Sequence, residues 1–269
     1  MQDLLRNIDN SVGECIEQLA EFVRIPSISA GADVDSSQAI QEAANFLVSQ
    51  FTRMNFTVQK AQIGANTNPL VIARSPGFSS ARPTVMIYGH YDVQGVDNPR
   101  AAWTVDPFAA EQRDGYMIAR GASDNKGPTF AHIKAVETML QAGSPLPVDL
   151  LFVIEGEEEC GSQALETFVQ NGGLDEYAPF LCTVISDTSM YGPDRPSLTL
   201  GLRGISYFEI SVRGPKQDVH SGLFGGVVHN PNAVLVQALA GLYNADGQIA
   251  VPGFYNGIEP LSATEKRHY

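Results

Sequence analysis

The sequence predicts an α/β fold in which a mostly parallel central sheet is flanked by helices. Two observations support this class: three apolar runs have the composition of buried strands, and segments with helical spacing of apolar residues lie between them. Strand and helix candidates alternate over roughly the first 200 residues, as the connections of a parallel sheet require. A chain of 269 residues with 43% hydrophobic content can also bury a sizeable core.

The elements expected before residue 200 are, in chain order, helices at 1–24 and 37–54, strands at 56–63, 70–74 and 83–89, a loop that enters a helix over 124–142, a strand at 148–154, a helix at 162–170 and a strand at 181–186. The helices are indicated by apolar residues at spacings of three and four, as in Leu5, Ile8 and Val12. The strands that begin near residues 83, 148 and 181 are nearly continuous apolar runs of the kind that parallel sheets bury. Ser162 is expected to cap the last helix, because a serine side chain can accept from its free amides.

The pattern changes near residue 200, where a domain boundary is predicted. Residues 205–212 alternate between apolar and polar side chains, as a half-exposed antiparallel strand does. A helix is expected over 232–244. We therefore expect residues 1–200 to form one domain and residues 201–269 to begin a smaller α+β domain that is truncated.

Composition argues against several classes of function. The net charge of −13 disfavours nucleic acid as a partner. No stretch approaches the ~20 apolar residues of a membrane span, and residues 1–24 lack the apolar segment of a signal peptide. Cys15, Cys160 and Cys182 show no paired spacing, so neither a disulfide framework nor a thiolate zinc site is expected. A cytoplasmic protein is predicted.

Side chains that can bind metal follow each of the three apolar runs. The first run leads to His90 and Asp92, the third leads to Asp187, and the second leads to glutamates at 155, 157, 158 and 159. Because ligands of open α/β sheets bind beyond the carboxyl ends of the strands, these side chains are expected at one edge. Asp124, in a Gly-Ala-Ser-Asp-Asn-Lys-Gly loop, is a further candidate.

The physical reason to expect a metal is charge. Several carboxylates within a few Å of one another resist ionisation, and a divalent cation between them removes that cost. One imidazole with several carboxylates and no thiolate suits Zn²⁺ or Mn²⁺. A pair of ions ~3.5–4 Å apart needs a bridging carboxylate and can share a hydroxide as the nucleophile. Of the adjacent Glu158 and Glu159, one can bind metal while the other accepts a proton.

Five motifs in order resemble a known enzyme family. They are Tyr88-Gly-His-Tyr-Asp-Val93, Arg120-Gly-Ala-Ser-Asp-Asn-Lys-Gly127, Glu155-Gly-Glu-Glu-Glu-Cys-Gly-Ser162, Ile185-Ser-Asp187 and His220-Ser-Gly222. The sequence resembles the dinuclear zinc metallopeptidase family of aminoacylase, acetylornithine deacetylase, succinyl-diaminopimelate desuccinylase and carnosinase. The branch of nonspecific dipeptidases and carnosinases is the most similar. The resemblance implies a zinc aminopeptidase-like catalytic domain over 1–200 and the start of a lid or dimerisation domain over 201–269.

The resemblance also implies a role for each site residue. The implied ligands of two divalent ions, Zn²⁺ with Mn²⁺ as the alternative, are His90, Asp124, Glu159 and Asp187. Asp124 would bridge both ions, while Asp92 would orient His90 from behind. Glu158 would be the general base that activates water and returns the proton to the leaving amine. A shift of one residue within the glutamate run would exchange the base and the ligand.

A partner subunit is implied as well. In this branch the histidine at position 220 reaches into the partner's site and stabilises the oxyanion, so a homodimer through the lid domain is expected. The second ion has only Asp124 and Glu159, one fewer than the ~3 protein ligands of a catalytic zinc. The sequence is therefore expected to be an N-terminal fragment, with weak occupancy of the second metal position and little activity in isolation.

Three functions are kept open. The first is metal-dependent hydrolysis of amide bonds in dipeptides or small peptides. The second is an N-acyl amino acid deacylase or desuccinylase, because both chemistries split an amide beside a carboxylate. The third is an inactive binding or dimerisation protein, although the core set from His90 to Asp187 is intact.

Overall fold

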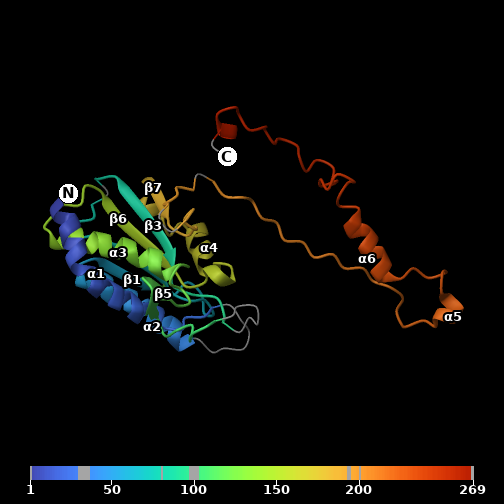
Figure 1. Ribbon diagram of the computed structural model, residues 1–269, viewed down its shortest axis with the longest axis horizontal. Coiled ribbons are helices and arrows are strands. Elements are labelled where there is room, and N and C mark those ends of the chain that lie inside the picture. Colours follow the sequence, from blue (N-terminus) through green and yellow to red (C-terminus); the bar gives the residue numbers. More distant parts are fainter. Residues whose placement is uncertain are drawn as a thin grey trace. The chain divides into compact units, whose positions relative to one another are not determined.

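The structure is a computed structural model that describes residues 2–29, 37–79, 81–96, 103–192, 195–199 and 201–267. The chain separates into two compact units, Met1–Leu198 and Thr199–Tyr269. Unit 1 contains the sheet and most of the helices, and unit 2 is the orange and red part of the ribbon (Figure 1). Each unit is described by itself.

A five-stranded sheet forms the centre of unit 1. Its strands are β1 (Thr57–Ala61), β2 (Leu70–Arg74), β3 (Thr84–His90), β6 (Asp149–Glu155) and β7 (Phe180–Ile185), in the spatial order β1-β2-β6-β3-β7. The pairs β3·β6 and β3·β7 are parallel, whereas β2 is antiparallel to both of its neighbours. Every strand except β2 therefore runs in the same direction, and the predicted mostly parallel α/β sheet is confirmed.

Helices cover both faces of this sheet (Figure 1). On one face, α1 (Gln2–Val23), α2 (Ser37–Arg53) and α3 (Lys126–Gln141) pack against Phe152 and Ile154. On the other face, α4 (Gln163–Gln170) packs against Leu151 and Val153 through Ala164. Successive residues of β6 thus enter opposite cores, which explains why its sequence is continuously apolar instead of alternating.

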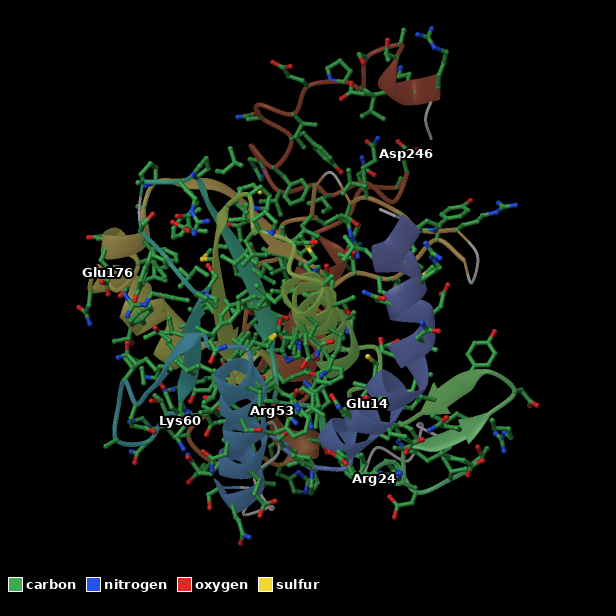
Figure 2. All side chains as sticks on the ribbon, turned by 90° about the vertical axis from the view of Figure 1, so that its left-hand side faces the viewer. Glu14, Arg24, Arg53, Lys60, Glu176 and Asp246 are labelled. Carbon is green, nitrogen blue, oxygen red and sulfur yellow. The ribbon has the colours of Figure 1, made fainter. Side chains whose placement is uncertain are left out.

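Several charged side chains lie outside these two cores. Glu14, Arg53, Lys60 and Glu176, on the helices and strands of unit 1, are exposed and point away from the core (Figure 2). This arrangement accounts for the helical periodicity from which α1 and α2 were predicted, because each helix presents one apolar stripe inwards.

The third apolar run does not form a buried strand as predicted. β7 is the edge of the sheet, with β3 as its only neighbour among the described strands, and Leu181 and Ile185 are 65% and 57% exposed. The prediction was wrong because apolar composition does not distinguish a central strand from an edge strand. Only the spatial order of the strands makes that distinction.

The cap predicted for α4 is also wrong. Ser162 precedes the helix but has φ 56° and ψ 35°, and its side chain accepts no amide of the helix. Its hydroxyl donates instead to Glu155 Oε1 at 2.9 Å. A buried carboxylate is the stronger acceptor for the hydroxyl, and this bond closes the glutamate-rich loop between β6 and α4.

A short hairpin was not predicted from the sequence. β4 (Glu111–Arg113) and β5 (Tyr116–Ile118) pair antiparallel around Asp114 and Gly115, whose φ angles are 55° and 82°. An Asp-Gly pair with positive φ at both positions is the preferred two-residue hairpin turn. The signal was present in the sequence, but the flanking strands are too short to show periodicity.

Unit 2 contains little regular structure. It has α5 (Ser221–Phe224), α6 (Pro231–Ala240) and a 3₁₀ turn at Glu265–Arg267. The strand predicted over 205–212 is absent: these described residues form no ladder, since no other described segment pairs with them. In the described ranges of the whole chain, none of the helices combines the length and apolar character that a membrane crossing requires.

Candidate metal centre

The parallel strands bring the predicted residues to one edge of the sheet. In the register of the ladder, His90 lies opposite Glu155, and Tyr88 lies opposite Ile185. The carboxyl ends of β3, β6 and β7 therefore coincide. Asp187 follows β7 by two residues, and Asp124 precedes α3 by two, so both lie near the end of β3.

Three side chains meet there with the spacing of a metal site. Ligand atoms of His90, Asp124 and Asp187 all lie within 4.8 Å of one another. His90 Nε2 is 3.0 Å from Asp124 Oδ1 and 3.5 Å from Asp187 Oδ2. The His90 side chain is fully buried, whereas those of Asp124 and Asp187 are 63% and 23% exposed. The cluster therefore faces solvent through its carboxylates, which leaves a route for a cation.

Asp92 lies behind His90 and holds its ring. His90 Nδ1 is 3.0 Å from the Asp92 carbonyl oxygen and 3.3 Å from Asp92 Oδ1. The Asp92 carboxylate also accepts from the backbone amides of Glu158 and Glu159 at 3.3 and 3.1 Å. This buried carboxylate fixes the imidazole with Nε2 towards Asp124 and Asp187, and it ties the glutamate loop to the same place.

The two adjacent glutamates have different surroundings. Glu158 Oε2 is 3.9 Å from His90 Nε2 and accepts no hydrogen bond from the residues that the structure describes, whereas Glu159 Oε2 accepts from Gln94 Nε2 at 2.9 Å. Burial raises the pKa of both carboxyls above the ordinary value. Glu158 is therefore the glutamate beside the three-residue cluster, and Glu159 lies outside the three.

The electrostatics of the cluster fit a cation. Although burial lowers the pKa of His90, hydrogen bonds with Asp187 and Asp92 raise it to about 11. The bond with His90 in turn is the largest cause that lowers the pKa of Asp187. An imidazolium is thus stabilised where carboxylates converge, and a divalent ion could replace its proton. One imidazole and two carboxylates form a donor set that suits Zn²⁺ or Mn²⁺.

The other two glutamates of the run stabilise the loop. Glu157 accepts from the backbone amides of Asn68 and Ala164 at 2.7 and 2.8 Å. Glu155 is fully buried, and its Oε1 accepts from Tyr88 Oη at 2.7 Å. Both side chains are thus engaged by other parts of unit 1, Glu157 by the segments before β2 and at the start of α4, and Glu155 by β3.

Two residues beside Asp124 were not assigned a role from the sequence. Asn125 is 1% exposed and contacts Asp187. Lys126 is fully buried and donates from Nζ to the carbonyl oxygens of Phe22 and Ile25 at 3.1 and 2.7 Å. Burial lowers the pKa of Lys126 to about 7. The sequence offered one signal for a role of these two residues, namely that they directly follow the candidate ligand Asp124.

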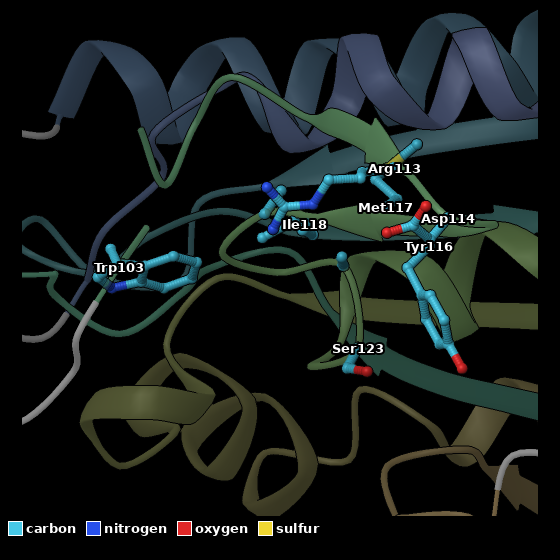
Figure 3. Close-up of a pocket in the computed structure, with 9 residues that line it drawn as sticks. Trp103, Arg113, Asp114, Tyr116, Met117, Ile118 and Ser123 are labelled. Atoms are coloured by element: carbon cyan, nitrogen blue, oxygen red, sulfur yellow. The ribbon is translucent and has the colours of Figure 1, made fainter. Parts of the chain in front are cut away.

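A pocket lies beside the loop that carries Asp124 (Figure 3). Trp103, Tyr116 and Ser123 line it, together with residues of the β4–β5 hairpin. Ser123 is adjacent to Asp124 in the chain, whereas His90, Asp124 and Asp187 are not among the residues that line the pocket.

His220 belongs to unit 2. Its Nδ1 accepts from the backbone amide of Gly222 at 3.0 Å, which caps the single turn of α5. The residue is exposed. Its predicted contact with the site of a partner subunit stays a prediction.

Comparisons with known proteins agree with this geometry. The family described as "Peptidase family M20/M25/M40" matches residues 86–254. The chain is 37% identical to the Cys-Gly metallodipeptidase dug1 of Schizosaccharomyces pombe, over 100% of this chain and 58% of that protein. It is 35% identical to the human Beta-Ala-His dipeptidase, over 100% of this chain and 54% of that protein.

Solved structures give the same result. The di-peptidase Dug1p from Saccharomyces cerevisiae superposes with a TM-score of 0.77 at 28% identity, covering 100% of this chain and 58% of that one. Human carnosine dipeptidase 1 superposes with a TM-score of 0.74 at 31% identity, covering 100% of this chain and 57% of that one. The chain thus spans a little over half the length of these relatives.

Proposed function

We propose, from the premise that the chain belongs to peptidase family M20/M25/M40, that it is part of an enzyme that hydrolyses the amide bond of dipeptides or small peptides. The observation that carries the proposal is the convergence of His90, Asp124 and Asp187 at one edge of the sheet, with Glu158 beside them. The names of the relatives, Cys-Gly metallodipeptidase and Beta-Ala-His dipeptidase, support dipeptides as the substrate class.

The proposed site holds two divalent ions, with Zn²⁺ as the first choice and Mn²⁺ as the alternative. The residues that would hold them are His90, Asp124, Glu159 and Asp187. When bound, such ions supply Lewis acidity for the negative charge that develops on the amide oxygen. The donor set of the three clustered side chains supports this assignment.

The chain's own residues supply the proton chemistry. Glu158 is the proposed general base, because its carboxylate is 3.9 Å from His90 Nε2 and burial raises its pKa above the ordinary value. Glu158 Oε2 takes a proton from the attacking water and later delivers it to the leaving amine. Asp92 keeps the His90 ring oriented throughout, since it contacts Nδ1 and the glutamate loop together.

The proposal includes assembly and location. We assign a homodimer in which His220 of unit 2 stabilises the oxyanion in the site of a partner subunit, and exposure of His220 is compatible with that role. A cytoplasmic location is supported by the three cysteines, all of which are free.

The test is the substitution Glu158→Gln. In the full-length enzyme of which this chain is proposed to be part, loss of the proton acceptor should lower kcat for Cys-Gly and β-Ala-His dipeptides by about 10²–10⁴-fold, while metal content by elemental analysis stays unchanged. Glu157→Gln is the matched control. Its carboxylate faces the Asn68 and Ala164 amides, so kcat should change by no more than a few-fold.

Two results would contradict the proposal. Equal rates for Glu158→Gln and the unsubstituted full-length enzyme would exclude Glu158 as the base. Turnover of N-acetyl or N-succinyl amino acids without turnover of any dipeptide would replace the dipeptidase by the deacylase alternative.

A further inference from the structure

Asn125 is an amide whose four hydrogen-bonding positions are all used. Its Nδ2 donates to Asp187 Oδ1 at 3.0 Å and to the Ser186 carbonyl oxygen at 2.8 Å. Its Oδ1 accepts from the His90 backbone amide at 3.3 Å and from Thr129 Oγ1 at 2.5 Å. Because only 1% of its surface is exposed, Asn125 makes its hydrogen bonds to protein groups and not to bulk water. A primary amide offers two donors and two acceptor positions, so this one is saturated.

These four bonds join the three segments that carry the candidate ligands. Asn125 follows Asp124 directly in the chain, and its side chain reaches the end of β3 at His90 and the segment after β7 at Asp187. Because the groups come from three separate parts of the fold, the amide fixes their relative positions in a way that local sequence cannot.

An amide in this orientation satisfies all of these surroundings. Nδ2 faces two acceptors, Asp187 Oδ1 and the Ser186 carbonyl oxygen, so an oxygen in its place would meet two oxygens. A carboxylate at residue 125 would also bring a second negative charge to 3.0 Å from Asp187.

The backbone of β3 leaves the space that this contact needs. A Cβ at Gly89 would lie 2.1 Å from Thr129 Oγ1 and 2.9 Å from Asn125 Oδ1. Any other residue at this position would push the amide away from the strand end, so glycine beside His90 is part of the same arrangement.

We propose that Asn125 is a positioning residue that selects which oxygen of Asp187 faces the metal. The amide occupies Oδ1 of Asp187, and Oδ2 is the oxygen that lies 3.5 Å from His90 Nε2. Asp187 is thereby held as a ligand through one oxygen, in the direction of Asp124. The inference rests on the proposed function, because it requires that the cluster binds a divalent ion.

The experiment compares metal binding by Asn125→Leu with that of the unsubstituted chain. Leucine has a similar volume and cannot hold Asp187. Substitutions of groups that orient metal ligands typically lower metal affinity by about 10–100-fold, and a loss of that size is expected for Zn²⁺ in calorimetry. With Co²⁺ as the probe, the visible absorption should also change shape, because Asp187 is free to offer either oxygen.

Gln50→Met is the matched control for the loss of a buried amide. Gln50 is 2% exposed on α2, and its Oε1 accepts from Lys134 Nζ at 3.2 Å, away from the cluster. It should lower the free energy of unfolding yet leave Zn²⁺ affinity within about threefold of the unsubstituted chain. Asn125→Ala is the second variant, for use if the leucine variant does not fold.

The outcomes separate this inference from the proposed function. If the folded Asn125 variants bind Zn²⁺ as tightly as the unsubstituted chain, with the same Co²⁺ spectrum, the positioning role is overturned and the metal site stands. A loss of affinity of the same size in Gln50→Met would also overturn it, because the effect would then be one of general stability. If the unsubstituted chain binds no divalent ion, the proposed site and the inference are both overturned.

Discussion

The two units of the chain differ in the burial of their apolar side chains, many of which are buried in unit 1, whereas those described in unit 2 are exposed or half-buried. In unit 1, Phe152 is fully buried in a core that helices and sheet form together. In unit 2, Phe208 is 87% exposed, and none of the residues described there is buried. The aromatic ring is the same in both places. The difference is the presence of a second apolar surface, without which an apolar segment has nothing against which to be buried.

Helices of the two units show the same contrast. α2 buries a stripe that includes Ile40, Ala44 and Leu47 against the sheet, whereas α6 has no buried residue although its sequence is almost wholly apolar. α6 is also short for a helix without tertiary contacts, since isolated helices below about 12–15 residues are marginal in water. Unit 1 is therefore stabilised by packing, and unit 2 depends on local signals such as caps.

The largest expected effect is a difference in the free energy of unfolding between matched Phe→Ala substitutions in the two units. Phe152→Ala should lower the free energy of unfolding by about 3–5 kcal/mol, because it leaves a cavity in the core. Phe208→Ala should change it by less than about 0.5 kcal/mol. Urea denaturation followed by the fluorescence of Trp103, the single tryptophan of the chain, measures both. Equal losses for the two variants would show that Phe208 is buried in solution.

A smaller effect is expected at the cap of α6. Asn230 accepts from the Asn232 amide at 2.9 Å, so Asn230→Ala should cost about 1 kcal/mol of helix stability. Hydrogen exchange of the α6 amides should accelerate accordingly, while the α2 amides stay unchanged. Gln237→Ala, on the exposed surface of the same helix, is the control. Unchanged α6 protection in Asn230→Ala would mean that packing, and not the cap, maintains the helix.

The smallest effect is a pH dependence that burial confers on unit 1. His132 Nε2 is 2.7 Å from Ser186 Oγ, and burial lowers the pKa of this histidine below its ordinary value of 6.5. The unfolded chain then binds more protons, so the free energy of unfolding should fall as the pH drops through 6.5 towards the folded-state pKa.

The variant His132→Gln should show a flatter profile between about pH 7 and 5, measured by urea denaturation at each pH. His229→Gln, at an exposed position of unit 2, is the control. Coincident profiles for His132→Gln and the unsubstituted chain would show that burial of His132 contributes nothing to the pH dependence.

Much of unit 1 could be predicted because its signals are local. β2 was expected at residues 70–74 and is observed at Leu70–Arg74, and α1 and α2 differ from their predicted bounds by a residue or so at each end. Side-chain periodicity and composition depend only on neighbours in the chain, so they predict helices and strands without knowledge of the tertiary structure.

The errors arise where a partner decides the outcome. β7 has the apolar composition of a buried strand, yet it lies at the edge of the sheet. The alternating segment at 205–212 has the pattern of a strand and forms none, since no described segment pairs with it. Ser162 has the chemistry of a cap and bonds to Glu155 instead. In each case the local sequence pattern is present, but the outcome depends on a tertiary neighbour that the sequence pattern does not reveal.

The sequence by itself determined that His90, Asp92, the glutamate run and Asp187 lie at or just after the ends of strands, because strand and turn preferences are properties of short segments. The tertiary structure decided which members of the glutamate run face the cluster. Glu157 is drawn aside by the amides of Asn68 and Ala164, and Glu158 is left beside His90. It also gave Asn125 its place between His90 and Asp187, because those contacts join segments that are distant in the chain and meet only when the sheet forms.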